Sequence, residues 1–266
     1  AARPGGVPGK MAEQPPPAGK GSRGPPAREL NGRFLVQKCS WRGRYRRVLA
    51  VGPRQVLTLD PGTLVVTNSW SLEGESDLKG VALGGAEAPD EQEFSLELRK
   101  DPGSRSFAKV KFQCACRREV LACLYRALLS HRSPSPLTRQ LLEVKSFSVQ
   151  KYEDGAWQPR VLHLRPHRLE AVDAGTRELA WALDYADLRD DPSFEVLRDD
   201  TTAGCFAVYG RDGVPAHLFA AAEAERIVRE AGRLAEGRVG VTVTVELSQR
   251  AVPDVLAAAQ RLDRSG

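Results

Sequence analysis

The chain has 266 residues, of which 41% are hydrophobic and 27% charged, and its formal net charge at pH 7 is +5. This length accommodates one large domain or two of ordinary size, and the hydrophobic content is sufficient for folded cores. No apolar run approaches the roughly 20 residues that span a bilayer, and no segment resembles a secretory signal, which argues against membrane-spanning and secreted classes.

The N-terminal segment is rich in residues that resist folding. Residues 1–29 hold seven Pro and six Gly and almost no large apolar side chain. Such a segment buries too little apolar surface to offset the entropy lost on folding. We therefore expect a disordered tail over residues 1–32.

The elements of a first unit, residues 33–132, follow the tail. Apolar Phe94, Leu96 and Leu98 alternate with polar neighbours, as in a half-buried strand. An apolar stripe at helical spacing predicts a helix over 116–131. The expected strands span 33–38, 44–51, 55–59, 64–70, 78–83, 93–99 and 107–112.

The second half of the chain repeats the first. The matches at an offset of 113 residues are Val36-Gln37-Lys38 with Val149-Gln150-Lys151, Arg47-Val48-Leu49 with Arg160-Val161-Leu162, and the turns at Asp60 and Asp173. Trp70 and Trp181 match at an offset of 111, which we attribute to a short loop deletion, and both are expected to pack in a core. Ordered matches at one offset indicate an internal duplication.

The repeat defines a second unit, residues 143–237, after a Pro-containing linker at 133–142. Its expected strands span 144–151, 159–164, 168–172, 178–183, 194–198, 204–209 and 215–219, with a helix over 221–236. Residues 238–266 contain one more expected strand, 240–247, and are expected to begin a following region. Short antiparallel strands closed by an amphipathic helix predict a mostly β fold of two tandem pleckstrin-homology-like barrels, each with seven strands and a C-terminal capping helix.

The sequence contains no recognisable catalytic motif and no motif for a resident metal or cofactor. Five cysteines lack paired CxxC spacing, which is typical of reduced cytosolic thiols. His163 and His167 have no third metal ligand nearby, and no nucleophile elbow or phosphate-cradling glycine loop occurs. We therefore expect a non-enzymatic protein without a cofactor.

The segment from Lys38 to Arg47 stands out by its charge. Between Asn31 and Leu59 there are seven Lys or Arg residues and no Asp or Glu. The segment reads as two strands and a tight turn, with Arg44 and Arg46 on one face and Tyr45 and Arg47 on the other. A one-sign cluster around aromatic side chains indicates a site for anionic groups. The spacing of Lys38, Arg44 and Arg46 is that of the common pleckstrin phosphoinositide motif.

In these motifs the chain resembles the N-terminal region of the receptor-mediated-endocytosis J-domain proteins, large endosomal DnaJ-type co-chaperones of animals and plants. The resemblance covers about residues 34–247. It rests on Lys38-x-Ser40-Trp41-Arg42-Gly43-Arg44-Tyr45-Arg46-Arg47-Val48, Leu64-x-Val66-Thr67-Asn68-x-Trp70, Glu93-Phe94-x-Leu96, Phe112, Asp184-Tyr185, Val208-Tyr209-Gly210 and His217-Leu218-Phe219-Ala220.

The resemblance implies binding of phosphatidylinositol 3-phosphate and a cytoplasmic protein held peripherally on the early endosome membrane, acting in endocytic trafficking. For the full-length family member it also implies endosomal sorting proteins and a heat-shock chaperone as partners. The family's lipid-binding positions carry over onto Lys38, Trp41, Tyr45 and Arg47. We expect a general positive field from Arg42, Arg44 and Arg46. The J-domain signature His-Pro-Asp does not occur in this sequence, so we expect chaperone activation to lie outside these residues.

Two alternatives to lipid binding follow from the residues themselves. The basic hairpin could bind an acidic protein segment, as part of an interaction scaffold. Nucleic-acid binding needs a broader basic surface than the second unit allows, because residues 184–200 carry seven acidic side chains against two Arg. We therefore expect no nucleic-acid partner, and we expect the second unit to pack on the first or to bind another protein.

Overall fold

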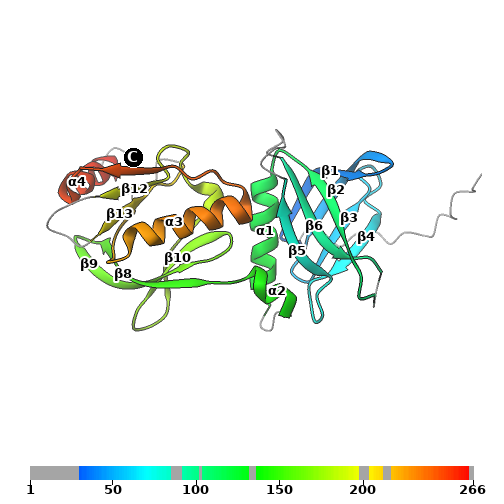
Figure 1. The fold of residues 1–266 in the computed structure, drawn as a ribbon, viewed down its shortest axis with the longest axis horizontal. Coiled ribbons are helices and arrows are strands. Elements are labelled where there is room, and N and C mark those ends of the chain that lie inside the picture. The colour runs from blue at the N-terminus through cyan, green and yellow to red at the C-terminus, as the bar shows by residue number, and fades with distance from the viewer. Residues whose placement is uncertain are drawn as a thin grey trace, which may run out of the picture.

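The computed structural model describes residues 30–84, 92–101, 104–131, 136–197, 204–211 and 217–263. The predicted tail lies outside the described residues as far as residue 29, and the first strand already begins at Gly32. Figure 1 shows two sheet-based units along the long axis, with helix α1 (Arg117–Leu129) standing between them. None of the described helices is long and apolar enough to cross a bilayer.

The first unit is one antiparallel sheet in the order β4-β3-β2-β1-β7-β6-β5, followed by α1. Its strands are β1 (Gly32–Ser40), β2 (Gly43–Val51), β3 (Gln55–Leu59), β4 (Val66–Ser71), β5 (Leu78–Leu83), β6 (Glu93–Arg99) and β7 (Phe107–Gln113). Strand β4 starts later than predicted, because Leu64 has a φ of 56° and belongs to the preceding turn. There Asp60 Oδ1 accepts hydrogen bonds from the amides of Gly62 and Thr63, both at 3.0 Å.

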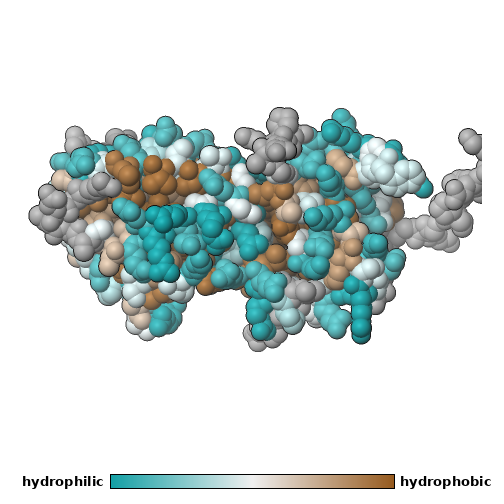
Figure 2. Space-filling model, viewed as in Figure 1, coloured by the Kyte–Doolittle hydropathy of each residue, from teal (hydrophilic) through white to brown (hydrophobic). Residues whose placement is uncertain are grey.

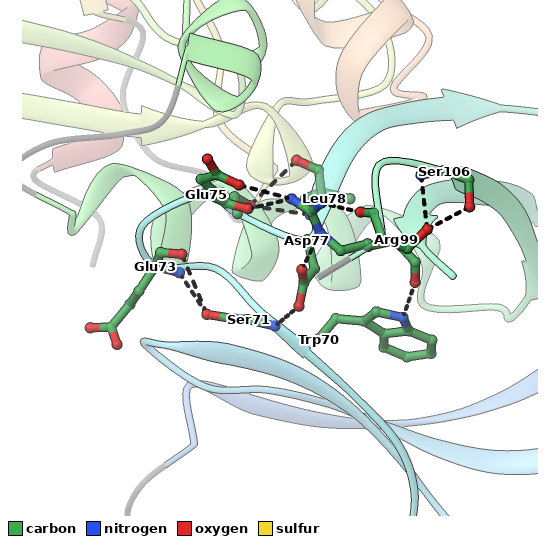
Figure 3. Close-up of polar contacts among 10 residues, drawn as sticks. Trp70, Ser71, Glu73, Glu75, Asp77, Leu78, Arg99 and Ser106 are labelled. Carbon is green, nitrogen blue, oxygen red and sulfur yellow. Dashed lines mark hydrogen bonds and ion pairs between the residues drawn. The ribbon is translucent and has the colours of Figure 1, made fainter. Parts of the chain in front are cut away.

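The edge strands β4 and β5 are joined mainly by side chains rather than by a ladder of backbone hydrogen bonds (Figure 3). The Asp77 carboxylate accepts from the Ser71 amide at 2.8 Å and from Arg99 Nε at 2.7 Å. The indole nitrogen of Trp70 donates to the carbonyl oxygen of Arg99 at 3.2 Å. The predicted pleckstrin-homology-like arrangement is confirmed with one correction: the unit is a folded-over sandwich and not a closed barrel.

The second unit repeats this plan in an eight-stranded sheet of order β11-β10-β9-β8-β14-β13-β12-β15. Its first seven strands are β8 (Lys145–Glu153), β9 (Ala156–Leu164), β10 (Arg168–Asp173), β11 (Leu179–Asp184), β12 (Phe194–Leu197), β13 (Cys205–Val208) and β14 (His217–Ala220). A short helical turn, η2 (Tyr185–Asp187), follows β11. Helix α3 (Ala224–Leu234) packs on the sheet and continues through the π-helical turn η3 (Ala235–Val239).

The backbone supports the internal duplication but corrects one detail of it. Strands β8, β9 and β11 begin and end 113 residues after β1, β2 and β4. Within this frame Trp181 occupies the register position of Asn68, because Thr58 pairs with Asn68 and Ala171 pairs with Trp181. The two tryptophans therefore lie two residues apart in register, and the expected loop deletion is wrong.

The segment predicted to begin a following region is built onto the second unit. Strand β15 (Val245–Ser248) pairs in parallel with β12 at the sheet edge. Helix α4 (Val252–Asp263) follows, and its Val252 and Val255 pack with buried residues of β12–β14. Val245 and Leu247 remain exposed, and Figure 2 shows apolar surface over this end of the molecule.

The two units share a hydrophobic core across α1. The predicted apolar stripe of this helix is buried, and one continuous cluster contains α1 together with core residues of both sheets. Arg126 of α1 lies 3.9 Å from the Asp184 carboxylate of β11. The predicted linker contains a short helix, α2 (Pro136–Leu141), which contacts β5. The second unit thus packs on the first, which is one of the two roles expected for it.

Candidate anion-binding hairpin

The basic segment forms a regular hairpin with a two-residue turn. Register pairs run without a bulge from Gly32–Val51 to Ser40–Gly43, which leaves Trp41 and Arg42 at the tip. The Ser40 hydroxyl accepts from the Arg42 amide at 3.2 Å and donates to the Gly43 carbonyl at 3.3 Å. Gly43 has a φ of 127°, which a residue with a side chain adopts only with strain. The hydrogen bonds of Ser40 and the positive φ of Gly43 therefore determine the conformation of the turn.

The tip presents an indole and a guanidinium to solvent. Trp41 is 88% exposed, so its ring is accessible from outside the molecule. The guanidinium carbon of Arg42 lies 4.7 Å from the centroid of the Trp41 ring. The hydroxyl of Tyr45 donates to the Arg42 carbonyl at 3.1 Å, which braces the turn from below.

The remaining basic side chains divide between two faces, as alternation predicted. In the register of β1 and β2, Lys38 lies opposite Tyr45, and Arg47 lies opposite the buried Val36. Side chains at opposite positions point to the same face, so these residues lie on the core-facing side of the sheet. Arg44 and Arg46 lie on the opposite face. There Arg44 Nη1 donates to Gln113 Oε1 at 3.1 Å, and both arginines line a hollow of about 390 Å³.

On the core-facing side the positive charges of Lys38 and Arg47 lie close enough to repel one another. Lys38 Nζ donates to Asn68 Oδ1 at 2.8 Å and lies 5.9 Å from the Trp70 ring centroid. Partial burial, and then the nearby charge of Arg47, lower the pKa of Lys38. Both effects disfavour the charged form of Lys38, and a bound anion would oppose them.

Across the described residues, no carboxylate forms an ion pair with any of the five basic side chains from Lys38 to Arg47. Asp60 lies close enough for Arg47 to contribute to the lowered pKa of its carboxyl group, but hydrogen bonds from Thr63 dominate that shift. The hairpin is therefore a cationic site open to an anion from outside.

The corresponding hairpin of the second unit carries its own anion. Lys151 and Arg160 stand where the first unit has Lys38 and Arg47, and Glu153 stands where it has Ser40. The Glu153 carboxylate pairs with Lys151, and it accepts from Arg160 Nη2 at 2.7 Å. Arg160 Nη1 also lies 2.8 Å from the Asp173 carboxylate. The second hairpin is thus neutralised internally.

Comparison with known proteins decides the family. Residues 33–130 match the family model described as the DNAJ protein RME-8 N-terminal domain. Over 233 residues the chain is 31% identical to DnaJ homolog subfamily C GRV2 of Arabidopsis thaliana, which covers 83% of this chain. The chain belongs to the RME-8 family, as its N-terminal region. It spans 9% of the length of that plant relative, and the predicted resemblance is confirmed.

Solved structures also match part of this RME-8-type region. Two structures of the Slm1 PH domain match at TM-scores of 0.29 and 0.27, with 10% and 9% sequence identity. They cover 39% and 37% of this chain and 97% and 93% of their own chains. The first is a complex of that domain with D-myo-inositol-4-phosphate.

Two residues of the RME-8-type hairpin site escaped the sequence reasoning. Asn68 holds the Lys38 ammonium, yet it lies on β4, thirty residues away, and only the register of the sheet brings it there. Ser40 lacks the carboxylate with which its counterpart Glu153 pairs with Lys151 and Arg160. Aligning the two hairpins at the 113-residue offset reveals this difference from sequence alone.

Proposed function

We propose that this RME-8-type region is a non-enzymatic membrane-targeting module that binds phosphatidylinositol 3-phosphate through the β1–β2 hairpin. It would hold a J-domain co-chaperone peripherally on the early endosome, for endosomal sorting and endocytic trafficking. The observation that carries the proposal is the pair of cations Lys38 and Arg47, unpaired with any described carboxylate, behind the exposed indole of Trp41. Family membership supports the choice of lipid.

The side chains divide the work of binding by their chemistry. Lys38 offers an ammonium and Arg47 a guanidinium fork, and charge-assisted hydrogen bonds from such groups to phosphate are strong. The indole of Trp41 is suited to the interface between lipid headgroups and acyl chains. Arg42, Arg44 and Arg46 add electrostatic attraction of about 1 kcal/mol each near an anionic leaflet. A single phosphate contact is weak, so these contributions act together.

The second unit is not expected to contact the membrane. Its acidic side chains disfavour an anionic membrane, and its hairpin charges are already satisfied. In the full-length protein, sorting proteins and a heat-shock chaperone would be the partners brought to the membrane. The hairpin of the first unit is then the membrane contact.

Co-sedimentation with vesicles tests the proposal. Vesicles of neutral lipid with phosphatidylinositol 3-phosphate should bind the chain more tightly than vesicles carrying the 4-phosphate or an equal charge of phosphatidylserine. Arg47→Ala and Trp41→Ala should each weaken binding at least about tenfold, a loss of about 1.4 kcal/mol. Arg54→Ala is the matched control, because Arg54 is an exposed cation of the same unit that pairs with Glu73 outside the hairpin.

Equal binding by the parent chain and the two hairpin variants would overturn the proposal. Binding that ignores the headgroup but responds to Arg47→Ala would show a general electrostatic site instead. Retained binding to an acidic peptide, with no binding to any vesicle, would favour the interaction scaffold.

A further inference from the structure

The two hairpins are the same structure with one chemical difference. Both place a lysine, an arginine and the last residue of the first strand at equivalent register positions, 113 residues apart. In the second hairpin that last residue, Glu153, contacts both cations. In the first hairpin it is Ser40, whose hydroxyl is engaged with its own turn.

We infer that Glu153 occupies, in the second unit, the position of a bound phosphate group, and that the residue at this position decides which unit accepts an external phosphate. The second unit thus contains a latent phosphate site, closed by its own side chain between Lys151 and Arg160. The first unit is open because Ser40 stands there. The assignment of the open site to a lipid phosphate rests on the proposed function above.

The geometry explains why a carboxylate fits this position. Residues two apart on a strand point to the same face, so the side chain of Glu153 lies beside that of Lys151. Arg160 is on the neighbouring strand and donates to the second carboxylate oxygen at 2.7 Å. An anion with several oxygens can satisfy both cations at once, as phosphate does with paired basic groups.

Burial makes this internal anion necessary. Lys151 is only 4% exposed, and its Nζ lies 5.8 Å from the centroid of the Trp181 ring. A buried cation without a partner is costly. Burial alone would raise the pKa of Glu153, but hydrogen bonds from Lys151 and Arg160 outweigh it and lower that pKa. Glu153 is therefore ionised at neutral pH, as a phosphate would be.

The first arm of the test moves the carboxylate into the open hairpin. Ser40→Glu should lower binding to vesicles with phosphatidylinositol 3-phosphate at least tenfold, because the new side chain reaches Lys38 and Arg47. Ser40→Gln, which has the same size without the charge, is the matched control and should retain binding within about threefold. Equal binding by Ser40→Glu and the parent chain overturns the inference.

The second arm opens the latent site and uses free inorganic phosphate as the probe. Trp70 lies near Lys38 and Trp181 near Lys151, so their indole N–H signals in ¹⁵N NMR report the two sites separately. In the parent chain, phosphate should shift the Trp70 signal and leave Trp181 unchanged. Glu153→Gln should make Trp181 respond as well, whereas Ser40→Glu should silence Trp70. Sodium chloride at equal ionic strength is the control.

The outcomes separate this inference from the proposed function. A parent chain that fails to bind the vesicles, yet shows the expected phosphate pattern in all variants, contradicts lipid targeting and supports the latent site. A Trp181 signal that stays still in a folded Glu153→Gln variant overturns the latent site. If that variant does not fold, Glu153→Ser, which copies the first hairpin, replaces it. If neither variant folds, the Ser40→Glu arm decides.

Discussion

Arg117, the first residue of α1, donates a hydrogen bond from Nη2 to the main-chain carbonyl oxygen of Gly240, at 3.1 Å across 123 residues of sequence. The same guanidinium donates from Nη1 to the Glu93 carbonyl of the first sheet at 3.4 Å. Arg117 is largely buried, so one side chain ties the first sheet, the interunit helix and the end of η3 together.

Gly240 is the sensitive residue of this link. Its φ is 69°, and a Cβ there would lie 2.2 Å from Arg117 Nη2. Gly240→Ala should therefore reduce the free energy of unfolding by about 2 kcal/mol, from left-handed strain and from displacement of the arginine. Gly237→Ala is the control, since a Cβ at Gly237 meets no atom within 4 Å. Urea unfolding of the two variants measures the difference, and equal values would contradict this role of Arg117.

Acid should destabilise the protein through His167. This side chain is buried, and desolvation, followed by the charge of Arg168, lowers its pKa from 6.5 to about 3. The unfolded chain then binds more protons than the folded one between these values, so stability is lost as pH falls below 6.5. From pH 7 to pH 5 this group should cost about 2 kcal/mol.

Unfolding by urea at several pH values, in the parent chain and in His167→Leu, measures that contribution. The difference in stability between the two proteins should change by this amount over the interval. Parallel curves would show that His167 does not carry the acid sensitivity.

The tip residue Trp41 should matter for membranes and not for folding. Because the side chain is 88% exposed, Trp41→Ala should change the free energy of unfolding by no more than about 0.5 kcal/mol. Vesicle binding should nevertheless fall. Trp157→Ala in the second hairpin is the contrasting variant, because the Trp157 ring packs edge-on against Tyr152 at 5.3 Å and its loss should lower stability. Thermal unfolding and co-sedimentation of both variants check the contrast.

The Arg99 cluster should be worth more than an exposed ion pair. Arg99 donates to the Asp77 carboxylate and to the carbonyl of Glu75 at 2.8 Å, and its side chain is 10% exposed. Arg99→Ala should reduce the free energy of unfolding by about 3 kcal/mol, since it removes the cation that pairs with the Asp77 carboxylate at the sandwich edge. Lys79→Ala, which breaks the more exposed pair with Glu97, should cost less than about 1 kcal/mol. Similar losses of stability for the two variants in urea unfolding would contradict a special role of the Arg99 cluster in holding β4 and β5 together.

Much of this fold could be predicted because each strand shows its own local pattern of apolar and polar residues. Alternation located the first seven strands and their counterparts, and the repeat fixed the hairpins. Pairing with distant strands could not be predicted in the same way. Nothing in Gly240–Leu247 indicates that β15 joins β12 in parallel, since periodicity identifies a strand but not its partner. The left-handed Leu64 and the side-chain closure at Asp77 likewise depend on the folded context.

For the candidate site, too, local features could be predicted from the sequence, whereas contacts between distant strands could not. A run of unbalanced charge is visible in the sequence, so the hairpin residues from Lys38 to Arg47 could be predicted from the sequence alone. Which of them share a face followed from alternation and is confirmed by the register. The part played by Asn68 depends on cross-strand geometry, and the carboxylate of Glu153 gained its meaning only when its two cationic contacts were seen.

The location of α1 also determines how the molecule would stand on a bilayer. The β1–β2 turn projects from the side of the first unit that faces away from α1, whereas β15 and α4 lie at the opposite end of the long axis (Figure 1). Both sheets share one hydrophobic core across this helix, so the first unit lies between the turn and the second unit. If the β1–β2 turn contacts lipid as proposed, β15 and α4 would lie at the end of the molecule that is remote from the bilayer (Figure 1).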